Sequence, residues 1–123
     1  MKVMNVGIMS REDYKNRTIA IAKGEYKPKS NDPKIWFESV KSLSQVLSNE
    51  NQELLKFIIQ YKPQSITELE KISHRKKSNL SRTLKKLESY GIVSLIKENG
   101  KVVPKVKATD FRVEFGLNSA TFQ

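Results

Sequence analysis

The chain has 123 residues, with 23 basic and 13 acidic side chains, so its formal net charge is +10 at neutral pH. This length fits one domain with an added arm, and the absence of cysteine excludes disulfides and thiolate sites. The single histidine, His74, has no second histidine or carboxylate cluster near it to form a metal site. We therefore expect no enzyme, with no catalytic residue, metal or cofactor. Because no signal peptide or long apolar run is present, we expect a cytoplasmic protein with no membrane partner.

The N-terminal residues 1–33 predict an arm made of a strand and a helix. Residues 2–9 alternate weakly between apolar and polar side chains, which favours a short strand. Ser10, followed three residues later by Asp13, marks the start of a helix. Residues 24–33 are rich in Gly, Pro, Asn and Asp and predict an extended connection to the next domain.

Two further helices are predicted in the middle of the chain. Apolar residues recur with helical spacing from residue 35 to residue 47, and Trp36 is expected to be a large core anchor. The next helix should run from residue 48 to residue 62, where Pro63 stops it. Because this helix is apolar on more than one side, we expect it at the centre of the domain.

Residues 65–93 predict two helices joined by a short polar turn. Ser65 and Glu68 have the spacing of a capping box at the start of the first helix. His74 lies in the turn and tolerates a positive φ better than most residues do. The second helix is expected at about residues 77–90. Each helix carries one apolar stripe, which consists of Ile66, Leu69 and Ile72 in the first and of Leu80, Leu84 and Leu87 in the second.

The face of the second helix opposite its leucines combines cations with short hydrogen-bonding side chains. Arg and Lys bind phosphates and guanine edges, while Ser and Asn bind phosphates and adenine edges, so this face suits the major groove of DNA. The residues expected to read bases are Ser78, Asn79 and Arg82. The residues expected to contact phosphates are Thr67, Arg75, Lys76, Lys77, Ser81, Lys85 and Lys86.

Residues 92–108 predict a basic β-hairpin. Its turn is Asn99–Gly100, and both residues accept the positive φ of a two-residue hairpin turn. A basic hairpin beside a DNA-reading helix acts as a wing on phosphates or in the adjacent minor groove. The wing residues are expected to be Lys97, Asn99 and Lys101. The alternative is a hairpin whose lysines only keep an edge strand soluble.

The excess positive charge is concentrated in this part of the chain. Residues 71–107 hold 11 basic and 2 acidic side chains, whereas residues 1–70 hold 11 and 9. Because the excess coincides with the two helices and the hairpin, it favours a nucleic-acid partner over a surface that serves only solubility. Recognition of single-stranded RNA favours exposed aromatic side chains, and this segment has only Tyr90. An RNA-binding winged helix is therefore the weaker alternative.

The tail, residues 111–123, begins with apolar side chains alternating with Arg112, Glu114 and Gly116, which predicts a half-buried strand. The marginal strands at the two ends of the chain need partners, and a sheet built from arm and tail would supply them. If this sheet crosses between chains, it also makes a homodimer. The apolar residues of the alternation are Phe111, Val113, Phe115 and Leu117.

The segment ELEKISHRKKSNLSRTLKKLESYGIV, residues 68–93, resembles the winged helix-turn-helix of MarR-type transcriptional regulators. Residues 10–28 and 34–48 resemble the arm of a small group of bacterial and archaeal MarR-like proteins. The resemblance implies a mainly α fold with a small β part (α+β). A winged helix-turn-helix domain at residues 34–110 would lie between the arm and a C-terminal strand.

The resemblance also implies a function. We expect a sequence-specific regulator of transcription that binds double-stranded DNA, most simply as a dimeric repressor. Some members of the small group are antitoxins of toxin–antitoxin pairs. The alternative is therefore an antitoxin-type interaction module that neutralises a cognate toxin protein and autoregulates its operon.

Overall fold

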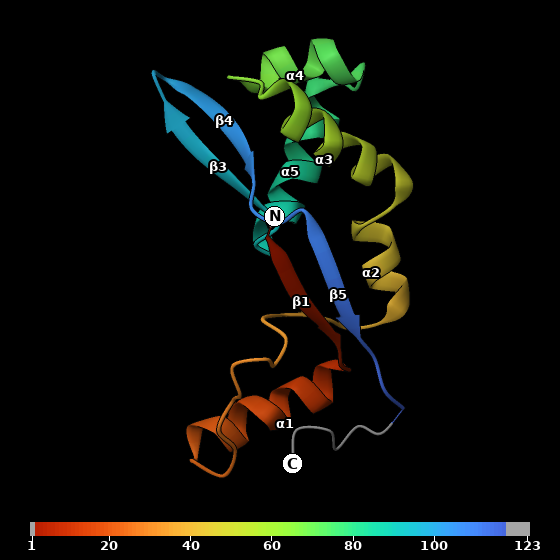
Figure 1. The fold of residues 1–123 in the computed structure, drawn as a ribbon, viewed down its shortest axis with the longest axis vertical. Coiled ribbons are helices and arrows are strands. Elements are labelled where there is room, and N and C mark those ends of the chain that lie inside the picture. The colour runs from red at the N-terminus through yellow and green to blue at the C-terminus, as the bar shows by residue number, and fades with distance from the viewer. Residues whose placement is uncertain (1, 118–123) are drawn as a thin grey trace. The chain divides into compact units, whose positions relative to one another are not determined.

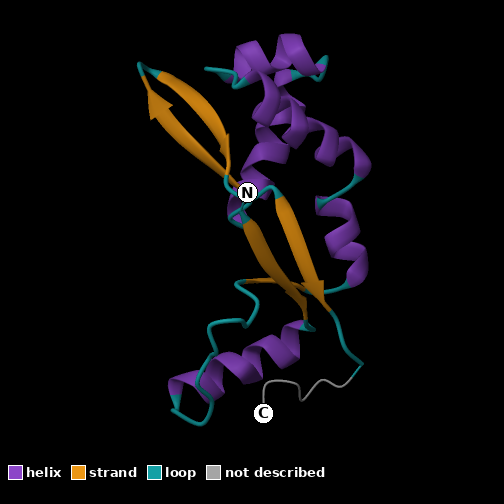
Figure 2. Cartoon of the chain, in the orientation of Figure 1, coloured by secondary structure: helices purple, strands orange, loops and turns teal. Residues whose placement is uncertain are grey.

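The computed structural model describes residues 2–117, which form an α+β fold of five helices and five strands (Figure 1; Figure 2). The chain divides into two compact units. Among the described residues, the arm unit comprises residues 3–44 and 110–117, and the helix–hairpin unit comprises residues 45–109. These limits differ from the predicted boundaries at residues 33 and 110, because residues 34–44 belong with the arm.

The arm unit contains a parallel sheet in the order β2-β1-β5. Its central strand pairs on both sides, so that Val6 lies opposite Ile35 in β2 and opposite Val113 in β5. A sheet built from both ends of the chain is thus confirmed, but the predicted half-buried strand is wrong beyond Glu114, because β5 ends there and Leu117 is 96% exposed. The strands are β1 (Val3–Ile8), β2 (Ile35–Phe37) and β5 (Asp110–Glu114), and helix α1 (Arg11–Ala22) connects β1 to the loop before β2. Ser10 caps α1 as predicted, since its Oγ accepts the N–H of Asp13 at 3.2 Å.

The helix predicted at residues 35–47 is wrong in its first part. Residues 35–37 form β2, and the helix that follows, α2, spans only Val40–Val46. The segment Ile-Trp-Phe consists of β-branched and aromatic residues, which fit a pleated sheet, and Phe37 is only 1% exposed. Ser39 then begins the helix, because its Oγ accepts the N–H of Ser42 at 3.0 Å.

Gly7 in the central strand makes room for the indole ring of Trp36. A Cβ atom at Gly7 would lie 2.4 Å from Cζ3 of Trp36 and 2.9 Å from Cγ of Pro33. No side chain fits at those distances, so the sheet requires glycine at this position. Trp36 is half-buried there, with its ring packed against the strand at Gly7.

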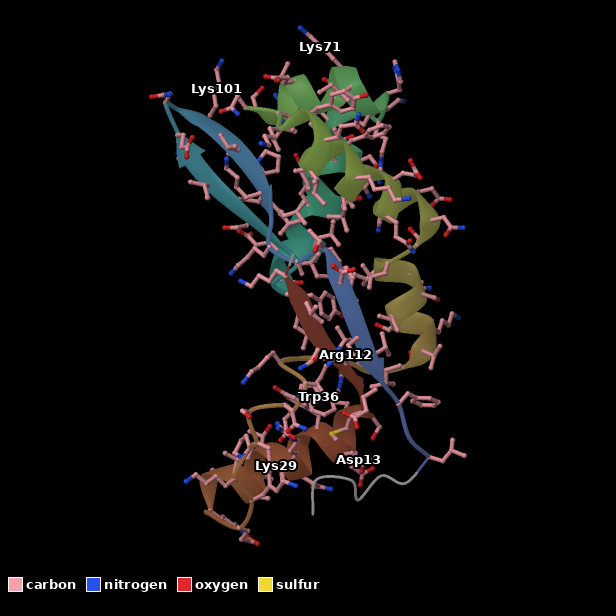
Figure 3. The ribbon with its side chains drawn as sticks, viewed as in Figure 1. Asp13, Lys29, Trp36, Lys71, Lys101 and Arg112 are labelled. Atoms are coloured by element: carbon pink, nitrogen blue, oxygen red, sulfur yellow. The ribbon has the colours of Figure 1, made fainter. Side chains whose placement is uncertain are left out.

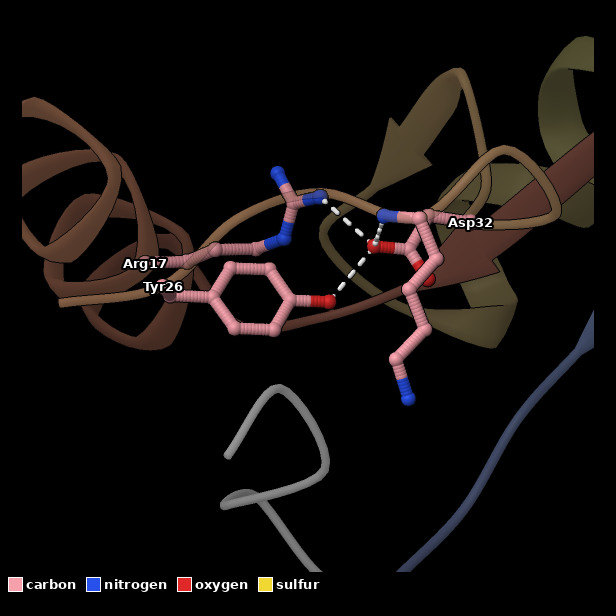
Figure 4. Close-up of polar contacts among 4 residues, drawn as sticks. Arg17, Tyr26 and Asp32 are labelled. Carbon is pink, nitrogen blue, oxygen red and sulfur yellow. Dashed lines mark hydrogen bonds and ion pairs between the residues drawn. The ribbon is translucent and has the colours of Figure 1, made fainter. Parts of the chain in front are cut away.

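A polar cluster fastens the loop at residues 24–33 to α1 (Figure 4). Arg17 of α1 is only 8% exposed, and its guanidinium lies 5.0 Å from the ring centre of Trp36 and 5.5 Å from that of Tyr26. The Asp32 carboxylate accepts the Tyr26 hydroxyl at 2.5 Å, the Lys29 N–H at 3.1 Å and the guanidinium at 3.5 Å. The predicted extended connection is therefore a loop held against a buried arginine.

The hydrogen bond between Tyr26 and Asp32 shifts the pKa of both groups. It is the largest cause that lowers the pKa of the Asp32 carboxyl, and the Lys29 N–H and Arg17 also lower it, while burial acts in the opposite direction. The same bond raises the pKa of the Tyr26 hydroxyl. Since the carboxyl has a lower pKa in the folded state, its contribution to stability is present above the unfolded pKa of about 4. It is lost as the pH falls through the folded pKa.

The helix–hairpin unit follows the predicted order of three helices and a hairpin. Leu54, Leu69 and Ile92 are among the residues of its core that are at most 1% exposed. Ser65 caps the second of these helices as predicted, Ser48 caps the first, and His74 adopts a φ of 60° at the end of the second. The elements are α3 (Asn49–Tyr61), α4 (Ile66–Ser73), α5 (Lys77–Ser89), β3 (Val93–Glu98) and β4 (Lys101–Val106).

We expect Asp32→Asn to lower the free energy of unfolding at pH 7 by about 1–3 kcal/mol, because Tyr26 and Arg17 lose a charged acceptor. The wild type should lose stability as the pH falls below the unfolded carboxyl pKa of about 4 and through the lowered folded pKa of Asp32. The variant should lose less over the same range. Urea unfolding followed by the fluorescence of Trp36, the single tryptophan, measures both. Tyr26→Phe is the control that retains the carboxylate, and identical pH profiles for wild type and Asp32→Asn would contradict the assignment.

Candidate nucleic-acid interface

Helix α5 has one buried side and one exposed side. Its three predicted core leucines, Leu80, Leu84 and Leu87, are each 0% exposed. The basic face of α5, as the exposed side is called below, consists of Lys77, Ser78, Arg82, Lys85 and Lys86. Ser81 lies at its border and is half-buried. Because a single stripe of leucines holds the helix, its rotation about its own axis is fixed and the same side chains always face outward.

The start of α5 is capped from another helix. Lys76 occupies the cap position and its side chain makes no capping hydrogen bond. Instead, the Glu70 carboxylate of α4 accepts the backbone N–H of Lys77 at 3.1 Å. A carboxylate at a helix N-terminus also complements the helix dipole. The sequence pattern did not indicate Glu70, because a capping side chain normally lies within three residues of the helix start, whereas Glu70 belongs to the preceding helix.

Two predicted phosphate ligands meet at the first turns of α4 and α5. The Lys77 Nζ donates a hydrogen bond to Oγ1 of Thr67 at 3.3 Å, and both side chains are exposed. The ammonium group retains two further N–H donors for another acceptor. The pair therefore offers an amine and a hydroxyl at one place, which is a suitable combination for a phosphate oxygen.

Arg75 bonds helices α3 and α5 to each other. Its Nε donates to Oδ1 of Asn79 at 2.9 Å, one Nη donates to Oγ1 of Thr83 at 3.2 Å, and the other Nη lies 3.4 Å from Oδ1 of Asn51. Asn51 is itself held by a bond to the Val46 carbonyl at 3.0 Å. Arg75 was predicted to contact a phosphate, but the structure gives it internal partners and leaves it half-buried. Nothing in the sequence pattern had singled out Asn51 or Thr83.

This network restricts what Asn79 can recognise. Its Oδ1 already accepts a hydrogen bond from Arg75, whereas its amide NH₂ donates to no described residue. Asn reads adenine with both its acceptor and its donor, and here the acceptor is shared with Arg75. The side chains of Ser78 and Arg82, by contrast, make no hydrogen bond or ion pair with any described residue. The three predicted base readers therefore lie together on α5, but Asn79 already has a partner within the protein and the side chains of Ser78 and Arg82 do not.

The hairpin carries a second set of exposed cations. Its two-residue turn is Asn99–Gly100, with φ angles of 52° and 75°, as predicted. Lys97, Asn99 and Lys101 are exposed, and Lys101 lies at the hairpin tip (Figure 3). The backbone N–H of Leu95 in β3 donates to the Glu88 carboxylate of α5 at 3.4 Å. The base of the hairpin is thereby tied to the end of α5.

The positive charge of residues 71–107 is almost entirely uncompensated. Arg75 is half-buried, whereas the other ten basic side chains of this segment are exposed. Within residues 2–117, none of these ten forms an ion pair with an acidic side chain. An anionic partner can therefore approach cations that have no competing protein carboxylate. The ten are Lys71, Lys76, Lys77, Arg82, Lys85, Lys86, Lys97, Lys101, Lys105 and Lys107.

Other kinds of site were also sought in the described part of the chain. It contains no group of three or more His, Cys, Asp or Glu side chains that could hold a metal ion. None of its helices combines the length and the apolar character needed to cross a membrane.

Comparison with known proteins gave a match to one protein family, over the part of the chain that contains α5 and the hairpin. Searches of curated proteins and of solved structures found no match. The model of one family, HVO_A0114, matches residues 46–113, more than half of the chain. The matched region contains α3, α4, α5 and the hairpin. The chain therefore belongs to the HVO_A0114 family.

Proposed function

We propose that the protein is a sequence-specific regulator of transcription that binds double-stranded DNA through a MarR-like winged helix-turn-helix. Helix α5 serves as the recognition helix in the major groove, and the β3–β4 hairpin serves as the wing on phosphates or in the adjacent minor groove. The simplest mechanism is repression, in which a dimer occupies a promoter. No chemical step is involved.

The observation that carries this proposal is the composition of the basic face of α5. A helix lying in the major groove needs its apolar side buried in its own protein and short donors and cations on the other side. The three fully buried leucines and the exposed Ser78 and Arg82 satisfy both conditions. Because Arg82 has no partner among the described residues, its planar guanidinium is available for a bidentate contact with guanine.

The lysines of the same region supply affinity. Each phosphate neutralised by a lysine releases counterions, so the binding constant should fall steeply with salt. Lys77 with Thr67, and Lys85 with Lys86, provide such contacts along α5, and the hairpin provides Lys97 and Lys101. These groups position the helix, whereas the base contacts specify the sequence.

The alternative of an RNA-binding winged helix lacks the side chains that it would use. Single-stranded RNA is bound largely by stacking bases on exposed aromatic rings. In residues 71–107 the single aromatic side chain is Tyr90, which is half-buried at the end of α5. This arrangement favours a duplex partner.

The antitoxin-type alternative finds support in the arm unit. A cleft of about 690 Å³ there is lined by charged side chains and by Trp36, Phe115 and Leu117. A cleft of this kind can accept a segment of another protein, such as a cognate toxin. Co-purification with the product of a neighbouring gene, lost in a variant of the cleft, would favour this function over that of a stand-alone regulator.

The first test of the proposal is a substitution at Arg82. Arg82→Ala should weaken binding to a specific fragment from the upstream region of the gene by about 1–3 kcal/mol and relax specificity, because a base contact is removed. Arg82→Lys is the matched control: it retains the charge but cannot form the bidentate contact, so binding to random duplex should remain. Fluorescence anisotropy with specific and random duplexes, measured over a salt series, gives both numbers. Equal weakening on every duplex would contradict base reading.

The hairpin should behave differently from α5. Lys97→Ala should weaken binding to all duplexes to a similar degree and reduce the slope of the logarithm of affinity against that of salt concentration by about 1, because a phosphate contact is lost. Lys56→Ala, which removes an exposed lysine of α3 beside Glu53, is the control for net charge. A loss confined to the specific sequence would contradict the phosphate role of Lys97.

Arg75 should act mainly through stability. Arg75→Ala leaves Asn51, Asn79 and Thr83 without their donor, and we expect it to lower the free energy of unfolding by about 1–3 kcal/mol. Arg82→Ala should change it by less than about 0.5 kcal/mol, since Arg82 is exposed. Urea denaturation of both variants decides the question, and equal stabilities would show that the Arg75 network is not maintained in solution.

A further inference from the structure

Strand β5 lies at the edge of the arm-unit sheet, with β1 on one side and no described strand on the other. Solvent reaches this edge, because Val113 is 45% exposed and Phe115, which follows the strand, is 56% exposed. An edge strand with exposed apolar side chains offers backbone N–H and C=O groups to any strand that can pair with it. Proteins normally cover such an edge, so a partner for β5 is expected.

The sequence of β5 is complementary to itself in one register. A two-fold axis perpendicular to the sheet pairs two copies of β5 in antiparallel fashion and keeps the two faces of the sheet distinct. Opposite residues must then lie on the same face, so the axis passes through a residue opposite its own copy. If that residue is Val113, then Arg112 lies opposite Glu114 of the second copy, and Phe111 lies opposite Phe115.

The other registers fit less well. An axis through Arg112 sets two arginines opposite each other and Asp110 opposite Glu114, and an axis through Glu114 sets two glutamates opposite each other. Like charges directly across a sheet are destabilising. An axis through Phe111 sets Asp110 opposite Arg112, but it brings Glu114 opposite Ala108, which is 2% exposed, and Phe115 opposite the charged Lys107.

We propose that β5 is the homodimer interface of this protein, in which two copies pair antiparallel about Val113 and join their sheets into one of six strands. The occupant of the edge is a second copy because the pairing satisfies its own charges: Arg112 and Glu114 form no ion pair with a described residue of the same chain. The inference rests on the proposed function in one respect: the dimer would present two copies of the basic face of α5 to DNA. The pairing itself is independent of DNA.

Charge reversal tests the register. The chain has a mass of 14.2 kDa, so light scattering after size exclusion should give about 28 kDa for the wild type at micromolar concentration. Arg112→Glu or Glu114→Arg should each raise the dissociation constant at least about tenfold, because each reversal places like charges at two symmetric pairs. The double variant Arg112→Glu/Glu114→Arg restores opposite charges and should dimerise like the wild type. This rescue distinguishes pairing from a mere loss of folding, which circular dichroism monitors in all variants.

A cross-link tests the position of the axis. The chain has no cysteine, so a single introduced cysteine can form a disulfide only between copies. Val113→Cys should give a covalent dimer on oxidation, since the two copies of residue 113 face each other at about the Cα separation of 4.4–6.8 Å that a disulfide needs. Phe111→Cys is the matched control and should cross-link poorly, because it lies opposite residue 115.

Several outcomes would overturn the inference. A wild type that is monomeric at micromolar concentration excludes it, as does a dimer whose mass is unaffected by both single reversals. Cross-linking at position 111 and not at 113 would reject the Val113 register. A chain that remains monomeric until a toxin is added would assign the edge to that protein instead. DNA binding is measured separately by anisotropy, so failure of the dimer and failure of the proposed function are distinguishable.

Discussion

The burial of Leu80, Leu84 and Leu87 is the constraint on which the helix–hairpin unit depends. Each side chain is fully buried, and replacing any one of them with alanine would cost about 2–5 kcal/mol. The stripe sets the rotation of α5, and with it the side on which Ser78 and Arg82 emerge. The chemistry of the exposed side is therefore a consequence of how the buried side packs.

Polar contacts between helices then fix the finer geometry of that side. Glu70 of α4 caps α5, and Arg75 of the turn bonds α5 to α3 through Asn79 and Asn51. These bonds use charged groups that would otherwise be available to a ligand. Among the cations near α5, Arg75 is therefore used to bond helices to each other, whereas the Arg82 side chain has no partner among the described residues.

The arm unit follows the same logic with a different anchor. A buried arginine lies over two aromatic rings and binds the carboxylate of Asp32, which holds the loop before β2. Trp36, which follows that loop, packs its indole ring against Gly7 of the central strand. The result is a sheet with one strand from each end of the chain and with β5 at its outer edge.

Local patterns in the sequence determined the helices α3, α4 and α5, the serine cap of α4, the positive φ of His74 and the Asn-Gly turn of the hairpin. These features depend on residues within one or two turns of each other. Only the tertiary structure decided that residues 35–37 form a strand, because their pairing with β1 outweighs the helical spacing. It alone also placed Glu70 at the start of α5 and Arg75 among three partners, since these contacts join residues from different helices. Spacing along a chain reveals which face a side chain is on, whereas the partner it meets depends on how the elements pack.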